Sequence, residues 1–294
     1  MRLIVTGASG HLGRRVTEYL LDGGVAPADL ILVTRSPEGL ADAAARGADV
    51  RAGDFDDPAS LRAAFAGGDR LLLISTDALG RRVPQHQAAI DAAKAAGVGF
   101  VAYTSLVKAS ADNPAAVAGE HLATEEHLRA SGLDWALLRN ALYSELQVPT
   151  AAGALASGVF ATNIGDGRAA YISRDDCAAV AAAVLRGPGH EGQIYEVTGP
   201  EALTAEDIAA AFSQVGGRPV EVLRLDDDAY IAGLVEHGVP AEAAPLFASF
   251  GRAAREGFDD LVTDVVERLT GRAPASLADV LARHREQLPQ PAAS

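Results

Sequence analysis

Short apolar runs alternate with longer amphipathic segments through the first half of the chain. The runs of strand length are residues 2–5, 30–33, 70–74 and 99–103, a short and more polar strand is predicted at 49–51, and helical patterns lie between them. Continuous apolar runs between helices are typical of a parallel sheet that is covered on both faces. The alternation continues through Leu138, and a series of strand, helix and strand units with right-handed crossovers predicts a doubly wound sheet.

The strict alternation ends after Asn140. Residues 151–168 carry four glycines with apolar residues between them. This pattern predicts a loop-rich wall or lid, with Phe160 and Ile164 offering apolar contact to a ligand, although a plain connecting loop fits equally well. Beyond it, the sequence predicts a helix capped by Ser173, a returning strand at 193–197, a half-buried strand at 220–225 and several short amphipathic helices.

The first strand leads directly into a glycine-rich turn. Its pattern is Thr6-Gly7-x-x-Gly10-x-x-Gly13, and a helical segment follows. Gly7 and Gly10 permit a tight turn and the close approach of an anion, while Gly13 permits close packing of helix on strand. The free N–H groups and positive dipole end of the helix attract a phosphate pair. An ordinary turn is the alternative, but this context favours a dinucleotide site formed by Gly7, Ser9, Gly10, His11, Leu12 and Gly13.

The residue after the second strand indicates which dinucleotide the turn holds. At the position where an acid would bind the adenosine ribose, the sequence reads Thr34-Arg35-Ser36. A carboxylate would repel a 2′-phosphate, whereas a guanidinium forms a charge-assisted pair with it. Arg35 therefore favours NADP(H) over NAD, unless it is simply an exposed surface arginine.

The glycine turn and the strand pattern together predict an α/β fold. We expect a doubly wound, parallel-sheet Rossmann domain over residues 1–140, with its sheet completed by 173–198, and a smaller C-terminal α/β substrate subdomain formed by 141–172 and 199–294. Ligands in such sheets lie at the carboxyl ends of the strands. Further candidates for cofactor contact at these ends are Asp54, Phe55, Ser75, Tyr103, Ser105 and Asn140.

Composition excludes several other classes of protein. The formal net charge of −14 disfavours binding to nucleic acid and to anionic membranes. No apolar run approaches the length needed to cross a bilayer, no leader pattern precedes the first strand, and Cys177 is the only cysteine, so we expect a cytoplasmic protein. The acids at 226–228 point in different directions and the histidines lack ligand spacing, so no metal site is expected. The tail at 289–294 is expected to be disordered.

Several motifs resemble one branch of a known superfamily. They include the glycine turn, Tyr103-Thr104-Ser105, Glu120-His121-x-x-Thr124-Glu125 and Arg139-Asn140-x-x-Tyr143-Ser144-Glu145. Together they resemble the NmrA-like branch of atypical short-chain dehydrogenases/reductases, and within it the bacterial NADPH quinone oxidoreductases and triphenylmethane-dye reductases. The resemblance covers nearly the whole chain. It implies a reductase that uses NADP(H) and leaves a homodimer possible.

The catalytic dyad of that superfamily is absent. Its tyrosine and lysine positions fall on Val117 and His121. Valine cannot deliver a proton, but a quinone tolerates this loss because hydride transfer gives an already stabilised hydroquinone anion. The resemblance thus implies hydride transfer from NADPH to a quinone-like acceptor by positioning. A non-catalytic NADP(H)-binding regulator is the alternative.

Four residues are candidates for donors near the acceptor. His121 could supply a proton near neutral pH or hold a ribose hydroxyl, or it could be a helix-surface histidine. Tyr103, Asn140 and Tyr143 lie at or just beyond predicted strand ends. Asn140 could instead be a turn residue, and Tyr143 could be a core aromatic.

Overall fold

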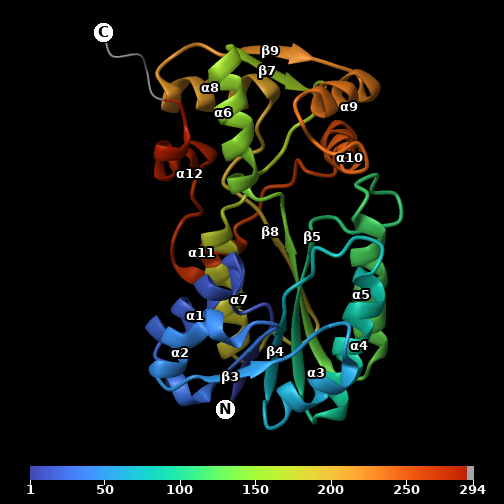
Figure 1. Ribbon diagram of the computed structural model, residues 1–294, viewed down its shortest axis with the longest axis vertical. Helices are drawn as coiled ribbons and strands as arrows, with labels where there is room; N and C mark the ends of the chain where they lie inside the picture. The colour runs from blue at the N-terminus through green and yellow to red at the C-terminus, as the bar shows by residue number, and fades with distance from the viewer. Residues whose placement is uncertain (290–294) are drawn as a thin grey trace.

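The computed structural model describes residues 1–289. Residues 290–294, which close the range expected for the smaller subdomain and its disordered tail, lie outside the described part. Figure 1 shows a larger lobe, which contains most of the strands, and a smaller lobe above it.

A seven-stranded sheet forms the centre of the larger lobe. Its strand order is β3-β2-β1-β4-β5-β6-β8, and every pairing is parallel. This arrangement confirms the predicted doubly wound sheet. The strands are β1 (Leu3–Val5), β2 (Leu30–Thr34), β3 (Asp49–Ala52), β4 (Arg70–Leu73), β5 (Phe100–Leu106), β6 (Asp134–Asn140) and β8 (Gln193–Val197).

Helices cover both faces of this sheet (Figure 1), because its strands are apolar on both sides. One face packs on α1 (His11–Asp22), α7 (Arg174–Arg186) and α11 (Val265–Thr270). The other packs on α3 (Pro58–Phe65), α4 (Arg82–Ala95) and α5 (Ala118–Ala130). The remaining short helices of this lobe are α2 (Ala41–Ala45) and the 3-10 turns η1 (Pro27–Asp29) and η2 (Pro37–Leu40).

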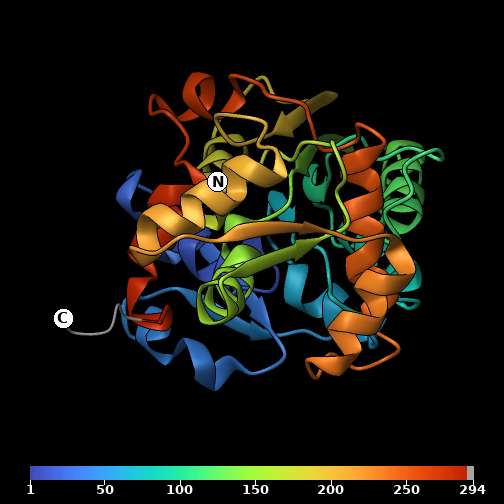
Figure 2. The same ribbon diagram turned by 90° about the horizontal axis from the view of Figure 1, so that it is seen from above.

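The smaller lobe has a two-stranded parallel sheet and its own apolar core. The strands β7 (Val159–Thr162) and β9 (Glu221–Arg224) pair with each other, and Figure 2 shows them side by side across this end of the molecule. Phe160 packs edge-on against Phe212, with ring centroids 5.2 Å apart. The helices outside the large sheet are η3 (Ser144–Leu146), α6 (Gln147–Ser157), α8 (Ala205–Gly216), α9 (Asp227–Glu236), α10 (Ala244–Arg255), α12 (Leu277–Arg283) and η4 (Arg285–Gln287).

The loop predicted at residues 151–168 is wrong over most of its length. Helix α6 runs through Gly153 and ends at Gly158, whose φ of +80° forms a left-handed C-cap. An apolar face that includes Ala151 and Leu155 is buried, and this burial outweighs the low helix propensity of glycine. Phe160 and Ile164 are 5% and 6% exposed within the lobe's own core, so they offer no surface to a ligand.

Candidate functional site

The glycine turn after β1 has the geometry of a phosphate cradle. Gly7 has a φ of +58°, and the Gly10 N–H donates to the Gly7 carbonyl over 2.9 Å. A Cβ added at Gly13 would lie 2.3 Å from the Gly7 oxygen and 2.7 Å from the Ala8 Cα. Only glycine at position 13 therefore lets α1 begin this close beneath the turn.

The amino end of α1 points its free N–H groups at the same turn. The helix starts at His11, and its N-cap is Gly10, which has no side chain to cap the first turn. His11 is exposed, whereas the Leu12 side chain is 7% exposed and belongs to the core below. The backbone of this turn, more than its side chains, is thus available to an anion.

Two arginines lie in the segments next to the turn. Arg35 directly follows β2 and is exposed, and it has no hydrogen bond or ion pair within 4.0 Å in the range 1–289. Its charge is near enough to help lower the pKa of Asp56. Arg14 donates from Nε to the Ser9 carbonyl (2.8 Å) and from Nη2 to the Gly39 carbonyl (2.6 Å). The Ser9 hydroxyl bonds the Thr34 hydroxyl at 2.7 Å, which ties the turn to β2. Sequence reasoning missed Arg14, although its place directly after Gly13 was a signal.

The ends of β3 and β4 place three further candidates at the carboxyl edge. Asp54 and Phe55 are half-buried after β3; an Asp54 carboxylate oxygen accepts the Asp56 N–H at 3.0 Å. The Phe55 ring lies edge-on to His86, with centroids 6.3 Å apart. Ser75 follows β4, and its N–H donates to the Thr104 hydroxyl at 2.9 Å. This hydrogen bond links the end of β4 to β5.

The expectation that Tyr103 and Ser105 lie at a strand end is wrong. Strand β5 continues to Leu106, which pairs in register with Asn140 of β6. Tyr103 is 0% exposed, and the Ser105 hydroxyl is buried and donates to Glu125 at 2.6 Å. Both side chains are buried beneath α5, where they bond His121 and Glu125.

His121 is buried instead of lying on the helix surface, and it does not exchange a proton near neutral pH as expected. It lies in the first turns of α5, is 6% exposed, and its Nδ1 is 2.8 Å from the Tyr103 hydroxyl. Burial, with the nearby charge of Arg82, holds the His121 pKa well below its ordinary value. The imidazole is therefore neutral at physiological pH, which corrects the expectation of proton exchange near neutrality.

Asn140 and Tyr143 meet at the carboxyl end of β6. The Asn140 amide is 3.4 Å from the Tyr143 hydroxyl, and the Arg174 guanidinium lies 5.1 Å from the centre of the tyrosine ring. Burial raises the pKa of Tyr143, so its phenol keeps its proton. The pair provides two neutral donor groups at this edge.

A buried acid between the lobes was missed by the sequence reasoning. Asp259 is 5% exposed, its Oδ2 has no hydrogen-bond partner among the residues that the structure describes, and its carbonyl accepts the Ala170 N–H. Burial raises its pKa to about 7, against an opposing effect of Lys108. A sequence pattern gives no sign of this, because burial follows from packing between distant segments.

Replacing Asp259 with asparagine should change how stability depends on pH. The folded protein holds the Asp259 proton up to about pH 7, whereas an unfolded aspartate releases it near 3.8. Wild-type stability should therefore fall relative to Asp259→Asn as pH rises from about 4 to 7, by up to about 4 kcal/mol. Urea unfolding of both proteins across this range measures the difference, and a constant difference would contradict the prediction.

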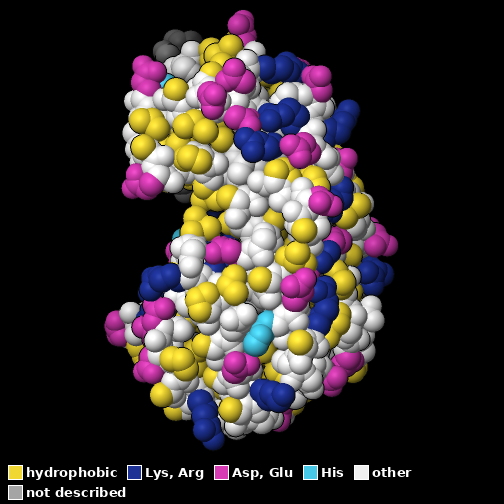
Figure 3. All heavy atoms as spheres, turned by 90° about the vertical axis from the view of Figure 1, so that its right-hand side faces the viewer, with side chains coloured by type: hydrophobic (Ala, Val, Ile, Leu, Met, Phe, Trp, Pro, Cys, Tyr) yellow, Lys and Arg dark blue, Asp and Glu magenta, His cyan; other side chains and the backbone are white. Residues whose placement is uncertain are grey.

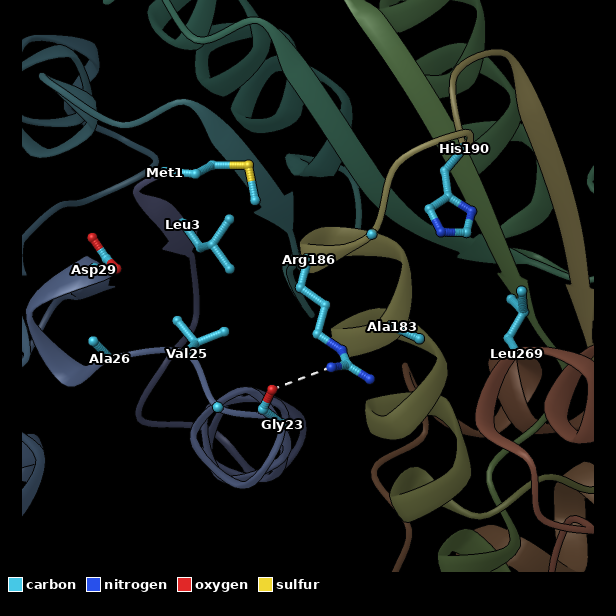
Figure 4. Close-up of a pocket in the computed structure, with 12 residues that line it drawn as sticks. Met1, Leu3, Gly23, Val25, Ala26, Asp29, Ala183, Arg186, His190 and Leu269 are labelled. Atoms are coloured by element: carbon cyan, nitrogen blue, oxygen red, sulfur yellow. Dashed lines mark hydrogen bonds between the residues drawn. The ribbon is translucent and has the colours of Figure 1, made fainter.

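The molecule has a notch between its two lobes and a separate pocket at the amino edge of the large sheet. Figure 3 shows a notch between the two lobes. A pocket of about 570 Å³ lies instead at the amino edge of the sheet, where the Arg186 guanidinium donates to the Gly23 carbonyl at 3.2 Å (Figure 4). Since Met1 and Leu3 line this pocket at the start of β1, it lies at the opposite end of the strands from the glycine turn.

No helix in residues 1–289 has the length and apolar character required to span a membrane.

Comparisons with known proteins agree with this geometry. Residues 7–188 match the NAD(P)H-binding family. The chain is 40% identical to quinone oxidoreductase 2 of Escherichia coli, over 94% of this chain and 96% of that protein. It is 31% identical to an NmrA-like family domain-containing oxidoreductase of Aspergillus flavus, over 79% of this chain and 76% of that protein.

Solved structures of NADPH-dependent reductases are also similar to this chain. The NADPH complex of an Escherichia coli NADPH-dependent quinone oxidoreductase superposes with a TM-score of 0.92 at 38% identity, covering 96% of this chain and 99% of that one. Triphenylmethane reductase of Citrobacter sp. with NADP(H) gives 0.90 at 32% identity, with the same coverage. The chain therefore belongs to the NAD(P)H-binding family, in the NmrA-like branch of oxidoreductases that its sequence resembles.

Proposed function

We propose that this protein is a reductase that transfers a hydride from NADPH to a quinone-like acceptor. The observation that carries the choice of NADPH is the position of Arg35, exposed and directly after Thr34, whose hydroxyl bonds Ser9 of the glycine turn. The relatives named for quinone reduction support the choice of acceptor. The single, buried Cys177 and the acidic charge fit a cytoplasmic location.

The carboxyl edge offers a continuous path for the cofactor. Gly7, Ser9 and the turn from Gly10 to Gly13 would hold the pyrophosphate against the end of α1. Arg35, supported by Arg14, would hold the 2′-phosphate. Asp54 and Phe55 suit the adenine, and Ser75 and Asn140 lie farther along the edge, toward β5 and β6.

The residues beyond this path form an apolar wall between the lobes. Leu106 and Val117 of the larger lobe pack in one cluster with Ala253 of α10. Partly buried side chains at the margin of this cluster are Leu142, Leu246, Phe250 and Phe258. An apolar surface with a few polar groups nearby suits a flat, weakly polar ring. This wall replaces Phe160 and Ile164 in our assignment.

Catalysis would rest on alignment and on neutral donors. When bound, NADPH supplies a hydride and its electron pair, and a proton from water completes reduction of a quinone to a hydroquinone. The chain would exclude water and orient the two rings. His121, Asn140 and Tyr143 would donate hydrogen bonds near the oxygen that gains charge, while Tyr103 acts only through His121.

Changing Arg35 to glutamate should separate the two coenzymes. We expect NADPH affinity to fall by on the order of 2 kcal/mol or more, about 30-fold, because a phosphate contact is lost and a like charge is introduced. NADH affinity should stay nearly unchanged. Titration calorimetry with both coenzymes measures this, and Arg218→Glu, an exposed arginine of the smaller lobe, controls for the same change of charge. Equal losses for both coenzymes would remove Arg35 from the site.

Turnover separates the enzyme from a regulator that only binds the nucleotide. NADPH absorbance should fall faster when benzoquinone is added to the protein than when it is omitted. Binding of NADPH without acceptor-dependent oxidation would favour the regulator.

A further inference from the structure

A chain of buried hydrogen bonds begins at the loop after β4. The backbone N–H of Thr76 donates to Nε2 of His86 over 3.0 Å. A backbone amide can only donate, so Nε2 must carry a lone pair. Burial and the charge of Arg82 lower the His86 pKa to about 3. The neutral His86 ring therefore carries its proton on Nδ1.

The Tyr103 hydroxyl lies between the two histidines. It is 3.3 Å from Nδ1 of His86 and 2.8 Å from Nδ1 of His121. Because the first of these nitrogens already carries a proton, the hydroxyl cannot donate to it. Thr124 also interacts with this hydroxyl, which lowers the Tyr103 pKa against the larger raising effect of burial. Nδ1 of His121, at 2.8 Å, is the nearest acceptor that can take the Tyr103 proton among the described residues. Tyr103 is 0% exposed, so bulk water does not compete for this proton.

Thr124 belongs to the same network and leaves the proton on Nδ1 of His86 in place. Its hydroxyl is 3.1 Å from Nδ1 of His86 and donates its own proton to the Glu120 carbonyl at 2.9 Å. It can thus accept from His86 but has no second proton to offer. With the Tyr103 proton on the 2.8 Å contact to Nδ1 of His121, the proton of the neutral His121 ring lies on Nε2.

The other ring nitrogen of His121, Nε2, lies at the end of this series of hydrogen bonds. Nε2 has no hydrogen-bond partner in the described part of the protein, yet it is not among the fully buried unpartnered atoms. The first turns of α4 and α5 lie at the carboxyl edge of the sheet, since both helices run antiparallel to the strands. This edge also carries the glycine turn.

We propose that Thr76, His86 and Tyr103 hold His121 as a neutral donor whose Nε2–H faces the ligand at the carboxyl edge. His86 and Tyr103 are positioning residues, because they act through His121. The inference deepens the proposed reductase function and rests on it for the identity of the ligand. The Nε2–H stabilises negative charge on the acceptor oxygen by a hydrogen bond. It keeps its proton, and water supplies the one that the product takes up.

Nitrogen-15 NMR of the histidine rings tests the assignment without any turnover. Long-range proton-nitrogen spectra should show His121 in the Nε2–H form from about pH 5.5 to 8.5. Its Nε2 signal should shift when NADP⁺ and benzoquinone, which do not react together, are added. His127, which pairs with Asp91 at 2.9 Å farther along α5, is the internal control. An Nδ1–H form, or titration of His121 within this range, would overturn the proposal.

Two matched variants test the positioning role. Tyr103→Phe should give His121 mixed ring forms and lower kcat at least about tenfold, with KM for NADPH within about twofold. Tyr195→Phe removes a similar contact, since the Tyr195 hydroxyl bonds Nδ1 of His190 at 2.7 Å near the amino-edge pocket. Tyr195→Phe should change neither the ring form of His121 nor kcat.

These outcomes separate the inference from the proposed function. If the His121 spectrum were the same in Tyr103→Phe as in the wild type, Tyr103 would not position His121, even if the variant were an active enzyme. If the His121 Nε2 signal did not shift on addition of NADP⁺ and benzoquinone, the Nε2–H group would not face the ligands. Failure of the wild type to oxidise NADPH with benzoquinone would instead refute the reductase function, and the ring spectra would still decide the proton positions.

Discussion

Replacing Gly13 with alanine should reduce NADPH affinity by at least about 100-fold, or about 3 kcal/mol. The added methyl group would lie 2.3 Å from the Gly7 carbonyl oxygen and 2.7 Å from the Ala8 Cα. Both neighbours are backbone atoms, so no side-chain rotation relieves the clash, and α1 must move away from the turn. The N–H groups that hold the phosphates would move with it. Titration calorimetry measures the loss.

A glycine in an open helical position controls for the substitution itself. Gly153 lies within α6, and a Cβ added there meets no atom within 4 Å. Gly153→Ala should leave NADPH binding unchanged and raise stability by roughly 0.5–1 kcal/mol. If Gly13→Ala bound NADPH as tightly as Gly153→Ala, the glycine turn would not be the pyrophosphate site.

Removing Glu125 should have the largest effect on stability. Glu125 is 0% exposed, and its carboxylate accepts hydrogen bonds from Ser105 (2.6 Å), Arg129 (2.9 Å) and Arg139 (2.6 and 2.8 Å). Glu125→Ala would leave the Arg139 charge with Glu196, at 3.0 Å, as its remaining ion-pair partner. We expect a loss of about 3–5 kcal/mol in the free energy of unfolding.

Urea unfolding measures this loss, with Glu126→Ala as the matched control. Glu126 is the next residue on α5 and is exposed, so its removal should cost less than about 0.5 kcal/mol. A loss below about 1 kcal/mol for Glu125→Ala would show that this network does not stabilise the fold. Through Ser105, Arg139 and Glu196, this network joins α5 to β5, β6 and β8.

Most strands and the glycine turn could be predicted, because their signals are local. Residues 30–33 and 71–73 are apolar and buried on both faces, as a covered parallel sheet requires. The end of β5 was misplaced because Thr104 and Ser105 are polar and resemble loop residues. Their pairing with β6 and the buried bond to Glu125 are long-range contacts that no local pattern contains.

The carboxyl-edge position of the site was predictable, but the chemistry of its histidine was not. The residues next to His121 in the sequence do not signal its lowered pKa, which results from burial and from the charge of Arg82 on another helix. His86 lies on a different helix, so its connection to His121 depends on how α4 and α5 pack on β5. Asp259 was missed for the same reason, since its burial arises where distant segments cross between the lobes.

Titration calorimetry of the wild-type protein with NADPH and NADH is the most direct test of the central claim. We expect NADPH to bind with a measurable heat and at least tenfold more tightly than NADH, because the proposed contact of Arg35 with the 2′-phosphate is available only to NADPH. Equal affinity for the two coenzymes, or no heat with either, would contradict this claim.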